Sequence, residues 1–375
     1  MRKHIIYRYF LFLSLVGLMQ LTLSCSSSSN EIEPLKPEGE DTPLEKDEYT
    51  FMNVEYRKWQ NGTFQAWTTA DSRETRTIDN MNWYTPSSDY SRTAWGGRIG
   101  LQPSSVVGKE GFFRVANCGG RSYLLDPDNG AVIIHGIQHV RPGESTAHKK
   151  AFGTRYGSEA RWSEETGKLL ADNHINYISY GSNRIEVFPA AVRGNLLTPK
   201  TQKIAYAENL YLLRTFMWDM SKNLGYAFDD DKYNRLVLLF EPTFATYIDR
   251  LVQEKSALFA GDRHFIGFYL DNELPFASYQ GTGYANTEGG GWLVHTQKNR
   301  GEFYQNFCLR LLETRNCVGW VHFEYNDGYD SNGKASNKGV VSIEYEPYES
   351  FLSQMRQLNL SVHSLIDYND TKSVQ

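Results

Sequence analysis

Short apolar runs alternate with longer helical stretches over the second two thirds of this sequence, and this alternation limits the possible folds more than any other feature. Five runs read as strands buried on both faces, at residues 131–137, 175–180, 212–218, 265–270 and 318–325. Apolar residues at helical spacing predict helices over residues 159–173, 244–258 and 300–314. Strands that alternate with helices form parallel βα units, so the sequence predicts an α/β fold.

The region ahead of these units reads as β or irregular structure. Residues 49–110 are rich in aromatic residues, Gly, Ser and Thr and show no helical periodicity. A hairpin is predicted next, with apolar strands at 112–115 and 123–125 around a turn at Gly119-Gly120. A second turn ends in Asn129-Gly130, and Asn-Gly between apolar runs is a strong turn signal.

The first residues of the chain have the pattern of an export signal. Three basic residues within the first eight precede an apolar run at 9–23, which is shorter than the roughly 20 residues that span a bilayer. Cys25 follows this run, and the segment resembles a bacterial lipoprotein signal in which that cysteine is lipidated. The alternative is an ordinary secretion signal with a bystander cysteine. The lipoprotein reading places the protein in the cell envelope, anchored to the outer membrane on its periplasmic or surface face.

The net charge and the cysteines of the chain indicate which classes of partner it is not expected to bind. The net charge is −5 without a basic cluster, which argues against nucleic acid. Residues 26–48 are rich in Ser, Pro and Glu and read as a flexible tether. Cys118, Cys308 and Cys317 make neither a disulfide framework nor a zinc pattern, so no metal or cofactor is predicted. Buried thiols are expected, with a Cys308–Cys317 bridge as the alternative.

The chain is expected to divide into four segments. These are the signal peptide (residues 1–25), the flexible tether (26–48), the β-rich segment (49–110) and the barrel-like part (111–370).

Two strand ends carry the residue types that sugar chemistry needs. The apolar strand at 265–270 delivers Asn272 and Glu273 at its carboxyl end, where βα barrels build active sites. A glutamate among aromatic residues can act as a general acid, and the asparagine amide can donate to a sugar hydroxyl. The alternative is an acid that caps the next helix.

The last strand alternates aromatic and polar residues. Trp320, His322 and Glu324 share one face of it, and an aromatic floor with polar neighbours suits a sugar-binding cleft. The alternative is that Trp320 packs inside the fold and His322 is a core histidine. We expect Glu273, Asn272, His322 and Glu324 to share one concave surface. Aromatic side chains would line it, from Trp320, Tyr325 or Trp292.

Several segments together resemble agarase-like glycoside hydrolases of the β-agarase and porphyranase type. The similar segments are 112–115, 120–128, 271–275, 283–294, 303–307 and 319–327. The resemblance implies a retaining β-glycosidase on a (β/α)₈ barrel that acts on galactose-containing polysaccharide. It also implies that Glu273 is the general acid/base, that Asn272 contacts the sugar, and that Glu324 and Asp327 lie among the substrate contacts.

The chain departs from that family in the middle of the barrel. Only 44 residues separate Glu273 from Val318, and one helix occupies part of them, so three further strands do not fit. The family's nucleophile, a second glutamate, belongs to this missing part. We therefore expect an incomplete barrel. Glu324 is a candidate second carboxylate, with Glu288 and Asp327 as further candidates. The alternative functions are a non-catalytic glycan-binding lipoprotein and a degenerate remnant of the enzyme.

Overall fold

The computed structural model describes the part of the chain that carries the predicted units. The described residues are 48–60, 63–87, 90–182, 190–197, 202–224, 241–271, 292–329 and 335–372. Residues Asp47–Gln375 form one compact unit. The predicted signal segment and Cys25 lie outside the described residues. No helix among those described is long and apolar enough to cross a bilayer.

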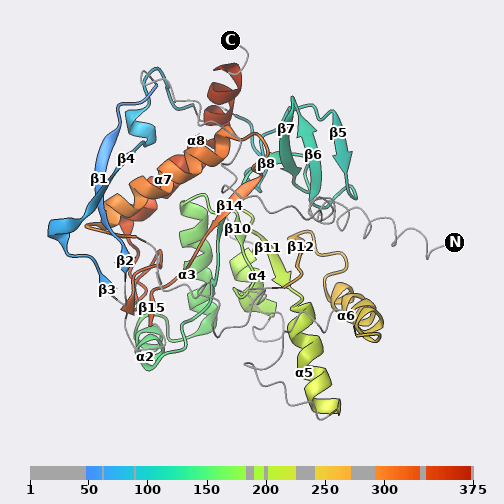
Figure 1. Ribbon diagram of the computed structural model, residues 1–375. Helices are drawn as coiled ribbons and strands as arrows, with labels where there is room; N and C mark the ends of the chain where they lie inside the picture. Colours follow the sequence, from blue (N-terminus) through green and yellow to red (C-terminus); the bar gives the residue numbers. More distant parts are fainter. Residues whose placement is uncertain are drawn as a thin grey trace, which may run out of the picture. The chain divides into compact units, whose positions relative to one another are not determined.

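A five-stranded parallel sheet forms the centre of this unit (Figure 1). Its strands, in spatial order, are β12 (Phe265–Tyr269), β11 (Ala205–Asn209), β10 (Tyr177–Ile178), β9 (Ile134–Ile137) and β14 (Gly319–His322). Every pairing in the sheet is parallel, and β14 lies beside β9. Within the described residues β12 and β14 are its two edges. The prediction of parallel strands is confirmed at four of its five positions.

The third predicted strand is wrong. Residues 212–218 belong to the helix α5 (Leu212–Leu224), and the strand of this unit is β11, a few residues earlier. Leu213, Phe216 and Met217 are buried, which is helical spacing. Trp218 is 60% exposed, so the apolar run has one buried face rather than the two faces of a central strand.

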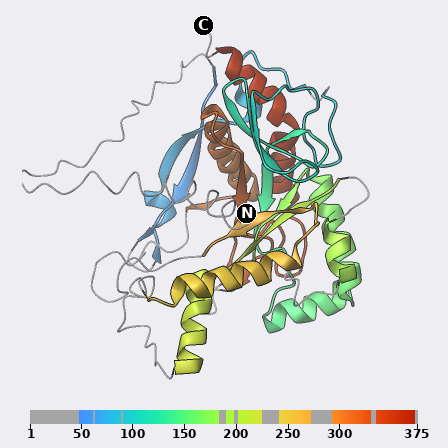
Figure 2. The ribbon, with the colours of Figure 1, turned by 90° about the vertical axis from the view of Figure 1, so that its right-hand side faces the viewer.

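Helices surround the parallel sheet. The predicted helices are confirmed as α3 (Glu159–Asp172), α6 (Phe244–Leu258) and α7 (Gln297–Glu313). Besides α5, the other described α-helices are α2 (Thr146–Arg155), α4 (Ala190–Leu197) and α8 (Glu349–Lys372). Figures 1 and 2 show α7 and α8 lying along each other. No helix was predicted from the sequence over the residues of α8.

An antiparallel sheet precedes the parallel one. It contains β5 (Ser105–Val107), β6 (Arg114–Cys118), β7 (Arg121–Leu125) and β8 (Ala131–Val132), which confirms the predicted hairpin. The apolar run at 131–137 is therefore divided, since its first residues pair with β7 and its last belong to β9.

The other strands form small antiparallel sheets. One joins β13 (Leu293–Val294), β1 (Met52–Arg57) and β4 (Asp71–Thr75). Two hairpins pair β2 (Trp59–Gln60) with β3 (Thr63–Phe64), and β15 (Gly328–Tyr329) with β16 (Ala335–Ser336). Two short 3₁₀ helices, Trp67–Thr69 and Ile78–Asn80, complete the described elements of the β-rich segment.

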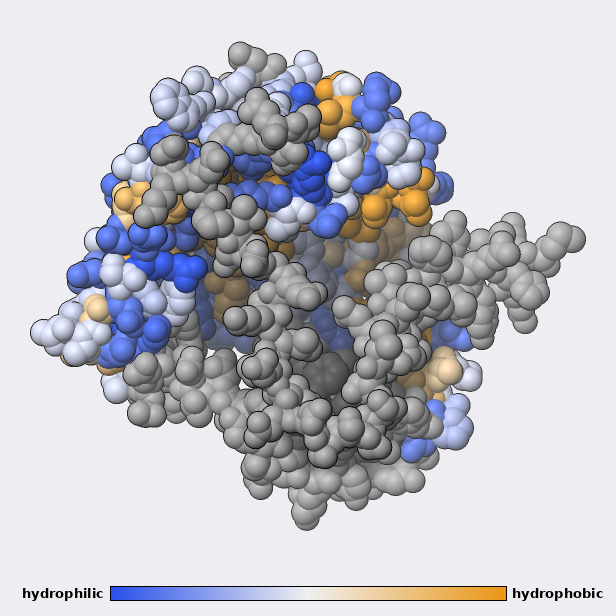
Figure 3. Space-filling model, turned by 45° about the horizontal axis from the view of Figure 1, so that its top comes forward, coloured by the Kyte–Doolittle hydropathy of each residue, from blue (hydrophilic) through white to orange (hydrophobic). Residues whose placement is uncertain are grey.

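Two large hydrophobic clusters hold the elements together. One packs Trp162 and Leu170 of α3 against Ile178 of the parallel sheet. The other packs α7 and α8 against the antiparallel sheet. Among the described residues on the face shown in Figure 3, most are hydrophilic, and the hydrophobic ones form small separate patches. Patches of this kind do not by themselves mark an interaction surface.

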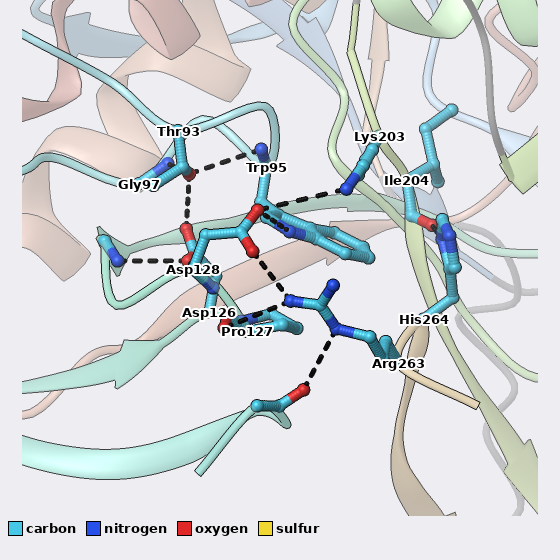
Figure 4. A network of polar contacts seen from close by, with 12 residues as sticks. Thr93, Trp95, Gly97, Asp126, Pro127, Asp128, Lys203, Ile204, Arg263 and His264 are labelled. Carbon is cyan, nitrogen blue, oxygen red and sulfur yellow. Dashed lines mark hydrogen bonds and ion pairs between the residues drawn. The ribbon is translucent and has the colours of Figure 1, made fainter. Parts of the chain in front are cut away.

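A polar network ties the Asp126–Gly130 turn to the amino ends of the parallel strands (Figure 4). Asp128 accepts hydrogen bonds from Trp95 Nε1 at 3.0 Å and Arg263 Nη2 at 2.6 Å. Burial raises the pKa of Asp126 despite the hydrogen bonds from Thr93 and the turn backbone. Ligands of open α/β sheets bind at the carboxyl ends, so this network holds the structure together at the opposite edge.

Candidate active site

The carboxyl ends of the five parallel strands meet at one edge of the sheet, where α/β folds bind their ligands. Among the described residues at or just after these ends are six polar or aromatic ones: His139, Ser179, Tyr180, Tyr211, Tyr269 and Glu324. They divide into a pair beside β9 and β14 and a tyrosine cluster over β10, β11 and β12.

The pair consists of His139 and Glu324. His139 Nδ1 lies 3.1 Å from Glu324 Oε2, and the two side chains are 26% and 17% exposed. The backbone aligns them, because Gln138 N donates to His322 O and Tyr325 N donates to Gln138 O, each at 3.0 Å. A carboxylate in this position can accept hydrogen bonds from a ligand or act as a base or nucleophile.

Two residues at this edge have left-handed backbone conformations. His139 has φ 55° and Tyr211 has φ 49°. Residues with a side chain rarely adopt such values, and strained conformations gather at functional sites. Gly181, at φ 74°, lies under the imidazole, because a Cβ there would be 2.8 Å from His139 Cδ2.

The tyrosine cluster presents aromatic surface over the other three strand ends. Tyr269 is 37% exposed, and its ring lies 4.7 Å from that of Tyr180. Its hydroxyl is 3.3 Å from Tyr177 Oη and 3.4 Å from Ser179 Oγ. Burial raises the pKa of Tyr177, so this hydroxyl stays protonated at neutral pH. An exposed ring next to fixed hydroxyls is suited to stacking on a sugar.

Asp327 holds the loop behind Glu324. Its carboxylate accepts from Gly339 N at 2.7 Å, Asn337 Nδ2 at 3.0 Å and Tyr348 Oη at 2.6 Å. The same loop contains Lys338, whose carbonyl oxygen accepts a hydrogen bond from the backbone N–H of Glu324. Asp327 is buried, so its contacts in this structure are within the protein.

Two predicted cleft residues of the last strand, Trp320 and Tyr325, lie in the core, and a third, His322, is half-buried. Trp320 is 7% exposed and donates from Nε1 to Tyr304 Oη at 2.5 Å. Tyr325 is fully buried against Thr166. His322 Nε2 lies 2.9 Å from Lys338 O, and burial lowers the pKa of this histidine to about 4. Neither aromatic ring offers a face to a ligand here, because both are covered by helices and loops.

The remaining predicted residues lie elsewhere or outside the described part. Trp292 stacks on Tyr56 of the small sheet, with ring centres 4.3 Å apart. Asn272, Glu273 and Glu288 lie outside the described residues. Asp271 is the last described residue before them, and its Oδ2 accepts a hydrogen bond from Leu213 N at 2.9 Å. That Glu273 and Glu324 share one surface stays a prediction.

The described residues contain no group of three or more His, Cys, Asp or Glu side chains arranged to hold a metal ion. Cys118, Cys308 and Cys317 are free thiols, so the alternative of a Cys308–Cys317 bridge is not found. Sequence reasoning missed His139, although it stands two residues beyond a predicted strand. Its position at a carboxyl strand end was the available signal.

Comparison with solved structures identifies the fold. BpGH50 matches over 86% of this chain and 96% of its own, with a TM-score of 0.68 and 19% sequence identity. The agarase AgWH50C and an exo-β-agarase match 75% of this chain, with identities of 13% and 11% and TM-scores of 0.44 and 0.45. No family model and no curated protein matches the sequence. The chain therefore shares the fold of BpGH50 over nearly that protein's full length.

Proposed function

We propose that this protein is a glycoside hydrolase of agarase type that cleaves β-galactosidic bonds in a polysaccharide by a retaining mechanism. The fold it shares with BpGH50, a protein named for glycoside hydrolase family 50, supports this proposal. The sequence resemblance to agarase-like enzymes points the same way. In this reading the parallel sheet is part of a (β/α) barrel that lacks some central strands.

The observation that carries the proposal is the carboxylate of Glu324 at the carboxyl edge of the sheet. It is partly exposed, and the exposed ring of Phe323 lies beside it. The tyrosine cluster supplies further aromatic surface over the neighbouring strand ends. Carboxylates combined with aromatic faces are what glycoside cleavage and sugar binding need.

The proposed mechanism uses two carboxyl groups about 5 to 5.5 Å apart. Glu273 would protonate the leaving glycosidic oxygen while Asn272 donates to a sugar hydroxyl. Glu324 would attack the anomeric carbon and form a covalent glycosyl-enzyme. Glu273 would then take a proton from water, which attacks the same carbon and releases Glu324. The configuration at the anomeric carbon is retained after two inversions.

Release of reducing ends from agarose and porphyran tests the activity. Glu273→Gln should lower the rate about 10²- to 10⁴-fold, as loss of a general acid does. An aryl β-galactoside with a good leaving group should be affected much less, because its oxygen needs no proton. Glu324→Gln should abolish turnover of both substrates. Glu254→Gln, on the exposed surface of α6, is the matched control and should retain full activity.

The test also separates the other functions. Oligosaccharide binding without turnover would replace the hydrolase by a non-catalytic glycan-binding protein. Neither binding nor turnover would indicate a degenerate remnant. Turnover that survives Glu273→Gln would show that the general acid is assigned to the wrong residue.

The protein's location is a further part of the proposal. Its support is the basic and apolar amino-terminal segment that ends at Cys25. A lipid on this cysteine would hold the enzyme at the bacterial outer membrane, where polysaccharide is within reach.

A further inference from the structure

We propose that His139 is a positioning residue, which donates from Nδ1 to Glu324 and fixes the direction in which that carboxylate faces the bound sugar. None of the segments that resemble agarase-like enzymes contains His139. The assignment rests first on the geometry of the pair. Its consequence for ligand binding rests in addition on the proposed function.

The backbone brings the two side chains together. His139 follows β9 and Glu324 follows β14, and these strands are neighbours with His322 opposite Ile137. Hydrogen bonds at Gln138 extend the pairing beyond the strand ends. The Glu324 backbone is also fixed, because its N–H donates to Lys338 O and its carbonyl accepts from Val340 N. The position of the carboxylate therefore depends mainly on the rotation of the Glu324 side chain, and His139 contacts this side chain at its carboxylate.

The imidazole is confined on several sides. Its ring centre lies 5.1 Å from that of Phe323, in an edge-to-face arrangement. Gly181 leaves room for it, since a Cβ there would lie 2.8 Å from Cδ2 and 3.1 Å from Nε2. The adjoining backbone is anchored by Val140 N, which donates to Ser182 Oγ at 2.9 Å. A ring held in this way keeps Nδ1 directed at the carboxylate.

The backbone at His139 is adapted to this contact. A φ of 55° costs a residue with a side chain roughly 1 kcal/mol or more, and glycine or asparagine would be accepted more readily. Histidine adopts this conformation more readily than most residues with a side chain. In this conformation the imidazole makes its 3.1 Å contact with Glu324.

The contact predicts which ring nitrogen carries the proton. A neutral imidazole that donates to a carboxylate from Nδ1 must be the Nδ1–H tautomer, whereas free histidine favours Nε2–H. Long-range ¹H–¹⁵N spectra of the full chain with labelled histidine, at pH 8, distinguish the two tautomers. The His139 signals are assigned by their loss in His139→Asn. We expect Nδ1–H in the wild type and Nε2–H in Glu324→Ala; an Nε2–H tautomer in the wild type would overturn the assignment.

A matched pair of variants tests the effect on ligand binding. Asparagine and glycine both accept positive φ, but only asparagine keeps an N–H near the position of Nδ1. By calorimetry with an agarose-derived hexasaccharide, in a Glu273→Gln background that slows cleavage, His139→Asn should bind within about threefold of the Glu273→Gln parent. His139→Gly should bind about tenfold or more weakly, as expected for loss of a hydrogen bond to a charged group. Equal losses in the two variants would overturn the positioning role.

The two measurements separate this inference from the proposed function. Thermal unfolding of each variant establishes that it is folded. A Glu273→Gln parent that does not bind the hexasaccharide would contradict the proposed function, and the tautomer of His139 would still decide the assignment.

Discussion

Acidification from pH 7 to pH 5 is expected to lower the free energy of unfolding by about 6 kcal/mol, because three histidines, two buried and one half-buried, stay neutral in the folded protein. Burial lowers the pKa of His135 to about 3 and that of His322 and His363 to about 4. In the unfolded chain each would titrate near 6.5. His135 lies in β9 and His363 on α8, and both are buried, whereas the half-buried His322 is the last residue of β14.

The sign and size follow from proton linkage. Between pH 6.5 and the lower pKa of the folded state, the unfolded chain binds more protons than the folded protein. The contribution of these histidines to the free energy of unfolding is therefore fully present above pH 6.5 and decreases as the pH falls toward the folded pKa. Between pH 7 and pH 5 each histidine accounts for about 2 kcal/mol. The three together approach the whole stability of a typical domain, which is about 5–15 kcal/mol. Carboxylates remain mostly ionised over this interval and add little.

Urea unfolding at pH 7, 6 and 5 measures the effect, and single variants attribute it. His363→Gln keeps a donor near Gly96 O but cannot titrate, so its loss of stability between pH 7 and pH 5 should be about 2 kcal/mol smaller than that of the wild type. Ser361→Ala, another buried position on α8, is the control and should cost the same at each pH. A wild-type stability that is unchanged at pH 5, or an unaltered slope in His363→Gln, would refute the reasoning.

Two further predictions concern the anchor and the antiparallel sheet. Cys25→Ala should release the protein from the membrane fraction to the soluble fraction of cells, and unchanged fractionation would contradict lipidation. Arg121→Met should lower the free energy of unfolding by about 3 kcal/mol, because Asp370 and the carbonyl of Leu312 lose a fully buried partner. Lys168→Met, which breaks an exposed pair on α3, should cost under about 0.5 kcal/mol in the same urea titration.

The sequence predicted best where local chemistry decides the conformation. The turns at Gly119-Gly120 and Asn129-Gly130 were predicted from residue type, and Gly119, Gly120 and Asn129 all have positive φ in the structure. The hairpin and three of the helices follow from signals of the same short range.

The sequence predicted less well where packing decides. The strand β11 contains two alanines, a glutamate and an asparagine, which are poor strand formers, and it is a strand because its neighbours on both sides are strands. The apolar run after it looked like a strand because a short apolar run does not show whether one face or two are buried. At α8 a helical signal was present, since Leu358, Val362, Leu365 and Ile366 are all buried.

In the candidate site, too, residues marked by local chemistry could be predicted, whereas contacts set by packing could not. Glu324 was found because its residue type and strand position were both visible. The partner of Glu324 depends on the pairing of β9 with β14, which no local pattern reveals. Trp320 and Tyr325 were assigned to a cleft by their chemistry, but which side of the last strand meets the core depends on α7 and the loop at Lys338.

The pairing of β9 with β14 also has a consequence for how the chain is made. Gly319 pairs with Ile134. The strand β9 therefore cannot form one of its two pairings until the chain 185 residues further on has been synthesised. Contacts this distant in sequence slow folding. During translation, one edge of β9 is open to pairing with other chains, as edge strands generally are. We expect ribosome-bound chains that end before Gly319 to need protection from aggregation, and the arrival of the last strand to relieve it.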